Sequence, residues 1–206
     1  STRFRLVGDV ANGGLQVGDS NVWYTNSFDD SAWQLGTGGI GYDTDATYTP
    51  YFNIDLRAAI YNANGSCYIR IPFVVGSTEF SDAMLKVRYD DGFIAWLNGV
   101  EVARRNFAGT PAWNSSASTT NSDASAVQQA TVDISDYAGL IWQGTNMLAV
   151  QALNYGITSS DLLFSVELVA GEISPGAVSP TALTYTGPVS LTESTLIKAR
   201  AFQGKW

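Results

Sequence analysis

Aromatic, acidic and amide side chains stand in several segments of this chain that lack the alternating pattern of a strand. Trp113 follows Thr110-Pro111-Ala112, and Tyr155 follows Asn154. An aromatic ring can cover the C–H face of a pyranose, while Asp, Asn and Arg side chains can hydrogen-bond its hydroxyl groups. The residues of these types that we expect to contact a ligand are Trp113, Tyr155, Arg105, Asp91, Asp90, Asn154 and Tyr48. For Trp113, an anchoring role within its loop is the alternative.

The same residues offer little for catalysis. The chain has no histidine, which excludes a Ser-His-Asp triad, a Cys-His dyad and a histidine-ligated zinc. Asp90 and Asp91 are adjacent and should point apart, whereas a glycosidase needs two carboxyl groups that face each other across a cleft. We therefore expect no enzyme activity, with a hydrolase site built from Asp91 and Asp161 as the less favoured alternative.

Acidic side chains could instead hold a hard cation. Asp43-Thr44-Asp45 supplies carboxylate oxygens of the kind that Ca²⁺ prefers, but lacks the spacing of an EF-hand loop. Asp43 and Asp45 are the weak candidates for metal ligands. The single cysteine, Cys67, lies in an apolar run, where we expect a buried and inert thiol.

Composition limits the partners. The formal net charge is −8, so nucleic acid and anionic polysaccharides should be repelled. Hydrophobic residues make up 45% of the chain and charged residues 15%, as in a packed globular protein. No segment approaches the ~20 apolar residues that cross a bilayer, so we expect no membrane partner.

Apolar residues recur with period two in short runs, which is typical of an antiparallel all-β fold. The Asn98-Gly99 pair between two such runs favours a type I′ hairpin turn. A helical turn is expected from Asp55 to Asn62, with Asp55 as its N-cap. The predicted strands are Tyr68 to Val75, Met84 to Tyr89, Phe93 to Leu97, Val100 to Arg104, Ala130 to Ile134, Met147 to Leu153 and Leu162 to Val169. They suggest a two-sheet β-sandwich.

Antiparallel strands reverse direction, so successive connections fall at alternate ends of a sandwich. The connections 42–65, 90–92, 105–129 and 154–161 should therefore share one end, which we call the loop end. The opposite end should hold Asn98-Gly99 and the connection 135–145, where Trp142 is expected to act as a structural plug. Trp33 and Trp96 are expected in the core.

Two stretches resemble known families. Phe28-Asp29-Asp30-Ser31-Ala32-Trp33, Gly39-Ile40-Gly41-Tyr42 and Leu85 to Arg104 resemble the galactose-binding-like jelly roll, which occurs as the sugar-binding domain of family 2 glycoside hydrolases. Residues 183–202 resemble the latter half of the Ig-like domain at the C-terminus of bacterial chitobiases. The resemblance implies a jelly roll over residues 1–170, a partial Ig-like segment over 171–206, and a structural Ca²⁺ ion.

These expectations favour a non-catalytic carbohydrate-binding module. It would target a larger secreted bacterial protein, with a tethered catalytic domain, to a polysaccharide or oligosaccharide. The resemblance implies an extracellular location, and we expect a monomer. The alternative function is a structural or adhesion spacer that binds protein.

Overall fold

The structure is a computed structural model that describes residues 2–6, 23–31, 33–76, 80–172 and 186–188. The chain divides into two compact units, Ser1–Ile173 and Ser174–Trp206. Nearly all of the described residues belong to the first unit. The expected Ig-like segment lies outside the described residues except for 186–188.

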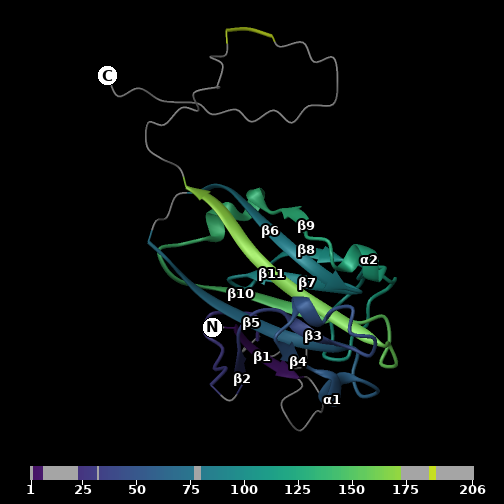
Figure 1. The fold of residues 1–206 in the computed structure, drawn as a ribbon. Coiled ribbons are helices and arrows are strands. Elements are labelled where there is room, and N and C mark those ends of the chain that lie inside the picture. The colour runs from purple at the N-terminus through teal and green to yellow at the C-terminus, as the bar shows by residue number, and fades with distance from the viewer. Residues whose placement is uncertain (1, 7–22, 32, 77–79, 173–185, 189–206) are drawn as a thin grey trace. The chain divides into compact units, whose positions relative to one another are not determined.

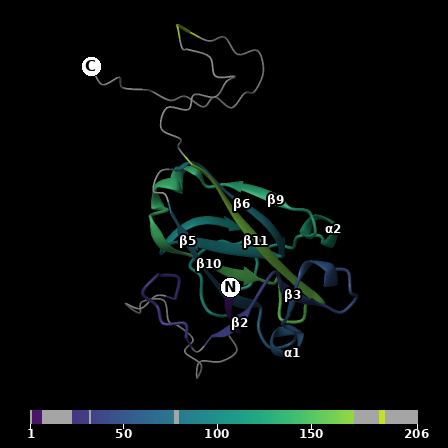
Figure 2. The same ribbon diagram turned by 60° about the vertical axis from the view of Figure 1, so that its left-hand side comes forward.

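The first unit is a β-sandwich of two layers, as expected (Figures 1 and 2). One sheet has six strands in the order β2-β1-β5-β10-β7-β8, and every neighbouring pair is antiparallel. These strands are β2 (Gln34–Gly36), β1 (Thr2–Leu6), β5 (Ser66–Val75), β10 (Gly144–Leu153), β7 (Gly92–Leu97) and β8 (Val100–Arg105).

The second sheet has five strands in the order β4-β3-β11-β6-β9. They are β4 (Ile54–Asp55), β3 (Ile40–Asp43), β11 (Asp161–Glu172), β6 (Phe80–Asp90) and β9 (Ala130–Asp133). Only the short β3–β4 pair is parallel among the described pairs of this sheet. The class is therefore all-β and predominantly antiparallel.

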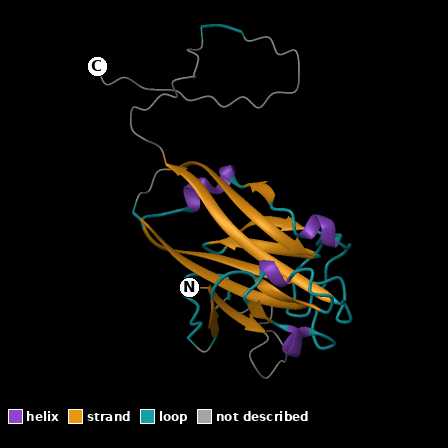
Figure 3. Ribbon diagram, viewed as in Figure 1, coloured by secondary structure: helices purple, strands orange, loops and turns teal. Residues whose placement is uncertain are grey.

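Helices are short turns between the strands (Figure 3). They are the α-helices α1 (Arg57–Ile60) and α2 (Asp123–Ala126), and the 3₁₀ turns η2 (Thr49–Tyr51) and η3 (Ser135–Leu140). The prediction of Asp55 as an N-cap is wrong, because Leu56 occupies that position. Asp55 is the residue before Leu56, and its side chain accepts the backbone N–H of Arg57 at 2.8 Å.

All seven predicted strands are present. Asn98 and Gly99 have φ of 51° and 92°, as a type I′ turn between β7 and β8 requires. The turn predicted at Asp90-Asp91-Gly92 differs from a hairpin, because β6 and β7 belong to different sheets. Asp91 is the residue at which the chain passes from one layer to the other.

Two apolar clusters follow from strand alternation. Along β5, Cys67 and Ile69 face the core between the sheets, while Tyr68 faces the outer side of the six-stranded sheet. Cys67 is fully buried, as expected, and burial raises the pKa of its thiol. Trp33 and Trp96 are buried as expected, but in the outer cluster rather than between the sheets.

Candidate functional site

The predicted loop end exists, and backbone hydrogen bonds join its connections. The N–H of Asp91 donates to Leu153 O at 2.9 Å, and the N–H of Asn154 donates to Gly65 O at 2.7 Å. The N–H of Ala117 donates to Asn154 O at 2.8 Å. Four connections remote in sequence are thus bonded to one another, and α1 and α2 lie at this end of the sandwich (Figure 1).

The carboxylate of Asp91 is the polar centre of this end. Its Oδ1 accepts the N–H of Asn121 at 2.9 Å and its Oδ2 accepts the N–H of Tyr155 at 2.7 Å. Its backbone carbonyl accepts Nδ2 of Asn106 at 2.8 Å. These bonds position the connections 105–129 and 154–161. Since the Asp91 side chain is only 4% exposed, it is not available to a ligand.

Asn154 is a second buried residue that joins the loops by hydrogen bonds. Its Nδ2 donates to Tyr42 Oη at 3.0 Å and to the carbonyl of Asp161 at 2.8 Å. The Tyr42 hydroxyl donates to Ser159 O at 2.8 Å. Burial raises the pKa of Tyr42 to about 12, so its hydroxyl stays protonated as a donor. These bonds fix the 154–161 turn that presents Tyr155.

The ligand-contact predictions for Asp90, Asp91, Asn154 and Tyr48 disagree with this placement. All four side chains are buried, and they lie beneath the loops rather than on the surface. Sequence reasoning placed them at the correct end of the sandwich but at the wrong depth. Asp91 and Asn154 are anchors that bond the loops, because a buried polar group is stable once it is hydrogen-bonded. Oδ2 of Asp90 and the hydroxyl of Tyr48 are buried without a hydrogen-bond partner in the described part of the chain.

Tyr155 and Arg105 are the predicted residues that reach solvent. The Tyr155 side chain is 56% exposed although its own backbone N–H is bound by buried Asp91. Arg105 is exposed at the end of β8, and its Nη1 donates to the carbonyl of Arg104 at 2.9 Å. The loop end therefore presents an aromatic ring on Tyr155, which is bonded to Asp91, and a cation on Arg105, which precedes Asn106, a second residue bonded to Asp91.

Trp113 is half-buried and packs against the outer aromatic cluster. Its carbonyl accepts the hydroxyl of Ser66 at 2.6 Å, and the carbonyl of Ala112 accepts Nε2 of Gln151 at 2.8 Å. Ser66 and Gln151 are buried polar residues that the sequence did not reveal as anchors. Trp113 thus has the loop-anchoring contacts of the alternative, with part of its ring still accessible.

The outer aromatic cluster covers one face of the six-stranded sheet. Trp23 stacks on Tyr68 with ring centroids 4.0 Å apart, and Tyr24 stacks on Trp96 at 5.0 Å. Trp23 and Trp96 are buried, whereas Tyr24 is only partly buried. The described residues 23–31 and 33 contain no strand, and their aromatic side chains form a layer over the strands of the six-stranded sheet.

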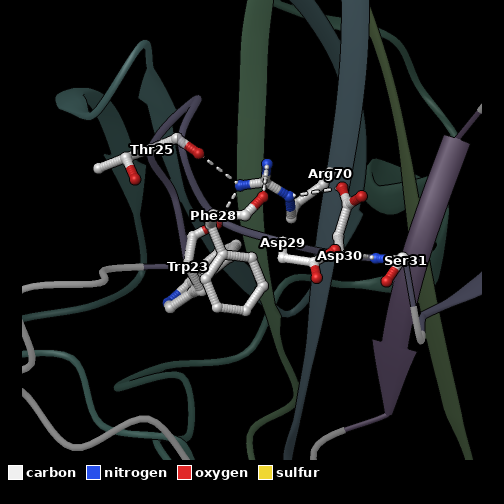
Figure 4. Close-up of polar contacts among 7 residues, drawn as sticks. All are labelled: Trp23, Thr25, Phe28, Asp29, Asp30, Ser31 and Arg70. Carbon is white, nitrogen blue, oxygen red and sulfur yellow. Dashed lines mark hydrogen bonds and ion pairs between the residues drawn. The ribbon is translucent and has the colours of Figure 1, made fainter.

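Arg70 holds that segment in place (Figure 4). Its side chain is 1% exposed and its Nε lies 2.8 Å from Oδ2 of Asp30. Its other nitrogens donate to the carbonyls of Trp23, Thr25 and Phe28. The planar guanidinium supplies donors in several directions at once, which a lysine could not do.

The metal candidates are engaged in a turn. Asp43 accepts the N–H of Asp45 at 2.7 Å and that of Tyr48 at 2.6 Å, while Asp45 is exposed. Within the described ranges, no three His, Cys, Asp or Glu side chains form a group that could hold a metal ion. The Asp43 and Asp45 pair therefore does not by itself make a Ca²⁺ site.

At the opposite end, the prediction that Trp142 is a buried plug is wrong. Its ring is 44% exposed, and its Nε1 donates to Thr145 O at 3.0 Å. Asn146, which is fully buried, closes this turn instead by bonding the N–H and the carbonyl of Trp142. Trp142 is therefore an exposed aromatic residue remote from the loop end.

A cavity is lined by residues of both sheets and of the β2–β3 connection. Of the side chains that line it, only that of Ser165 is polar, so it offers few groups to orient a hydroxylated ligand. The lining residues are Gly38, Gly39, Ile40, Ile69, Ile71, Phe164, Ser165 and Val166. Among the residues described, no helix has the length and apolar character to cross a membrane.

The fold and its loop end define an all-β sandwich domain with similarity to parts of glycoside hydrolases. No family model matches the chain, and no curated protein matches it. Among solved structures, it is similar to a Bacteroides uniformis β-glucuronidase with 17% identity and a TM-score of 0.42, over 80% of this chain and 17% of that one.

A glycosyl hydrolase family 2 member from Bacteroides cellulosilyticus gives 17% identity and a TM-score of 0.39, over 80% of this chain and 19% of that one. A Streptomyces avermitilis α-L-rhamnosidase complexed with L-rhamnose gives 21% identity and a TM-score of 0.37, over 53% of this chain and 9% of that one. The chain thus spans at most 19% of the length of these three structures.

Proposed function

We propose that the β-sandwich is a non-catalytic carbohydrate-binding module whose ligand lies at the loop end. The observation that carries the proposal is the exposed ring of Tyr155 on a turn fixed by buried Asp91. A ring held in advance loses little conformational freedom when a sugar stacks on it, and this favours binding. The galactose-binding-like resemblance in the sequence supports the same ligand class.

The charges at this end favour a neutral glycan. Asp45 and Asp123 are exposed in two connections of the loop end, 42–65 and 105–129. The whole chain carries a net charge of −8. This negative charge would repel an anionic polysaccharide, whereas Arg105 can donate hydrogen bonds to neutral hydroxyl groups. We therefore propose a neutral polysaccharide or oligosaccharide as the partner.

The carboxyl groups support binding rather than hydrolysis. Both oxygens of Asp91 accept backbone N–H groups, so this carboxylate is committed to the loops. The side chain of Asp90 is buried as well. A glycosidase needs two carboxyl groups that flank a sugar about 5–9.5 Å apart, and a buried carboxyl group does not meet that requirement.

The biological setting follows from the same proposal. A secreted module of this kind would tether a catalytic domain to its polysaccharide and raise the local substrate concentration. We propose that it acts as a monomer. A glycan array followed by calorimetry on the hits tests binding, and product analysis after incubation with a hit tests for hydrolysis.

One observation favours the alternative of a spacer or adhesion domain that binds protein. At the end opposite the loops, Val74 is 79% exposed on β5 and pairs with Thr145 of β10, close to exposed Trp142. Exposed apolar side chains of this kind occur at protein contacts. If the glycan array is empty and Trp142→Ala abolishes binding to a protein partner, this alternative replaces the carbohydrate proposal.

A further inference from the structure

Asp90 is a buried acid surrounded by other acids. Leu85 and Val87 of β6 face the core, so alternation places Asp90 on the outer face of the five-stranded sheet, where its side chain is 3% exposed. Buried Tyr48, Ala126 and Leu163 cluster at this sheet. The titratable groups around Asp90 are Asp91, Asp161 on β11, Tyr42 and Asp43 on β3, Tyr48 before η2 and Asp123 on α2.

Two polar atoms of this group are buried without a hydrogen-bond partner in the described part of the chain, Oδ2 of Asp90 and the hydroxyl oxygen of Tyr48. The neighbouring carboxyl groups of Asp91 and Asp161 cannot donate when they are ionised, whereas the Tyr48 hydroxyl is a donor beside them. Ionised Asp90 would add a third negative charge to these carboxyl groups, and a buried charge is costly unless it is paired.

The contacts of the other two acids indicate where a proton belongs. Asp91 accepts two backbone N–H groups, at 2.9 and 2.7 Å, which suits the ionised form. Asp161 is less buried, and its Oδ1 lies 3.3 Å from the hydroxyl of Ser159. The nearby cation on the same strand, Arg88, donates to Val127 O and lies over the ring of Tyr51.

We propose that Asp90 is a neutral carboxylic acid that donates a hydrogen bond to Asp161, and that loss of this proton loosens the segments 44–53 and 119–127 from the sheet. The protonated acid removes one negative charge from the cluster. This hydrogen bond between Asp90 and Asp161 is a property of the fold and does not depend on the ligand that the loop end binds. The cluster holds a proton rather than a metal ion.

The electrostatics of the cluster support the same assignment. Burial, followed by the Asp91 and Asp161 carboxyl groups, raises the pKa of Asp90 from 3.8 to about 9. Burial and the charge of Asp123 also raise the pKa of Asp161. Because the folded state retains a proton that the unfolded chain has lost, the contribution of Asp90 to stability is full below its ordinary pKa. It falls as the pH rises toward and through the raised value.

The test combines ¹³C NMR of the aspartate carboxyl carbons with thermal unfolding from about pH 5 to about pH 10. In the wild-type protein, the Asp90 carboxyl should be protonated at neutral pH and should titrate well above the other aspartates. Asp90→Asn, which keeps the shape without the charge, should lessen the fall in melting temperature at high pH. The control Asp136→Asn, on exposed η3 at the opposite end, should keep the wild-type fall.

Two outcomes would overturn the proposal. The first is an Asp90 carboxyl that is ionised at neutral pH in the wild-type protein, a result that needs no variant to fold. The second is a rise in melting temperature with millimolar CaCl₂ at neutral pH that Asp90→Asn abolishes. That result would show that a cation, rather than a proton, neutralises the cluster.

Discussion

The carboxylate of Asp91 and the backbone N–H of Tyr155 meet at 2.7 Å, although the two residues are 64 positions apart in the chain. The bond joins Asp91, which connects β6 of one sheet to β7 of the other, to the turn after β10. A buried acid therefore fixes the backbone of the most exposed aromatic residue at the loop end. Stability and the proposed ligand site depend here on the same side chain.

Removing the Asp91 carboxylate should destabilise the protein and loosen the connections 105–129 and 154–161 together. Asp91→Ala leaves the N–H groups of Asn121 and Tyr155 without their acceptor, and we expect a loss of about 3 kcal/mol in the free energy of unfolding. Asp91→Asn retains one acceptor oxygen and should lose less. Urea unfolding measures both variants.

The matched control for Asp91 is Asp136→Ala at the opposite end. Asp136 is exposed, so its loss should change the free energy of unfolding by no more than about 0.5 kcal/mol. Equal losses for Asp91→Ala and Asp136→Ala would show that Asp91 does not organise the loop end.

Arg70 should prove as important for the aromatic layer as Asp91 is for the loops. Arg70→Ala leaves Asp30 and three backbone carbonyls without their buried donor, at a cost of about 3–5 kcal/mol. Arg70→Lys should not restore the loss, because an ammonium group cannot reproduce the planar set of donors. Urea unfolding gives the energies, and limited proteolysis should cut within 23–33 in the variants. The control is Arg57→Ala, at an exposed residue. An equal effect of Arg57→Ala would show that Arg70 does not hold the aromatic layer in place.

Strong alternation made most of the sandwich predictable. The seven strands with clear period-two patterns are all present, and strand reversal alone placed the four connections of the loop end at one end. The strands β1 to β4 were missed because they have two to five residues each, too few for a pattern. The aromatic segment 23–33 was also missed, since it packs on the sheet without strand structure.

The depth of the site residues could not be predicted in the same way. Whether Asp91 is a ligand contact or an anchor depends on Tyr155 and Asn121, which are remote in sequence. The buried setting of Asp90 depends likewise on Asp161 and Tyr48. Local sequence indicates that such residues lie near a strand end, but only tertiary packing decides whether water reaches them.

A structural Ca²⁺ ion remains a prediction from the family resemblance and the acidic balance of the chain. A bound ion should raise the melting temperature in millimolar CaCl₂ compared with EDTA, because it stabilises the folded state by mass action. If Asp90 holds a proton, Asp90→Asn should show the same rise as the wild-type protein. Identical melting temperatures in CaCl₂ and EDTA would show that Ca²⁺ does not stabilise the folded protein.

The last prediction concerns the aromatic residues of the proposed glycan site. Tyr155→Ala should weaken binding of a glycan-array hit about tenfold to a hundredfold, which corresponds to roughly 1–3 kcal/mol for a lost stacking ring. Its melting temperature should change little, because the ring is exposed and Asp91 binds the backbone of Tyr155 rather than its side chain. Calorimetry measures the affinity.

Trp113→Ala should behave differently from Tyr155→Ala. The Trp113 side chain packs on the outer aromatic cluster, so its loss should lower the melting temperature as well as the affinity. The controls are Tyr137→Ala and Trp142→Ala, which remove exposed rings at the opposite end of the sandwich. Normal binding by Tyr155→Ala and Trp113→Ala, together with lost binding by folded Trp142→Ala, would mean that the ligand binds at the end that carries Trp142 and not at the loop end.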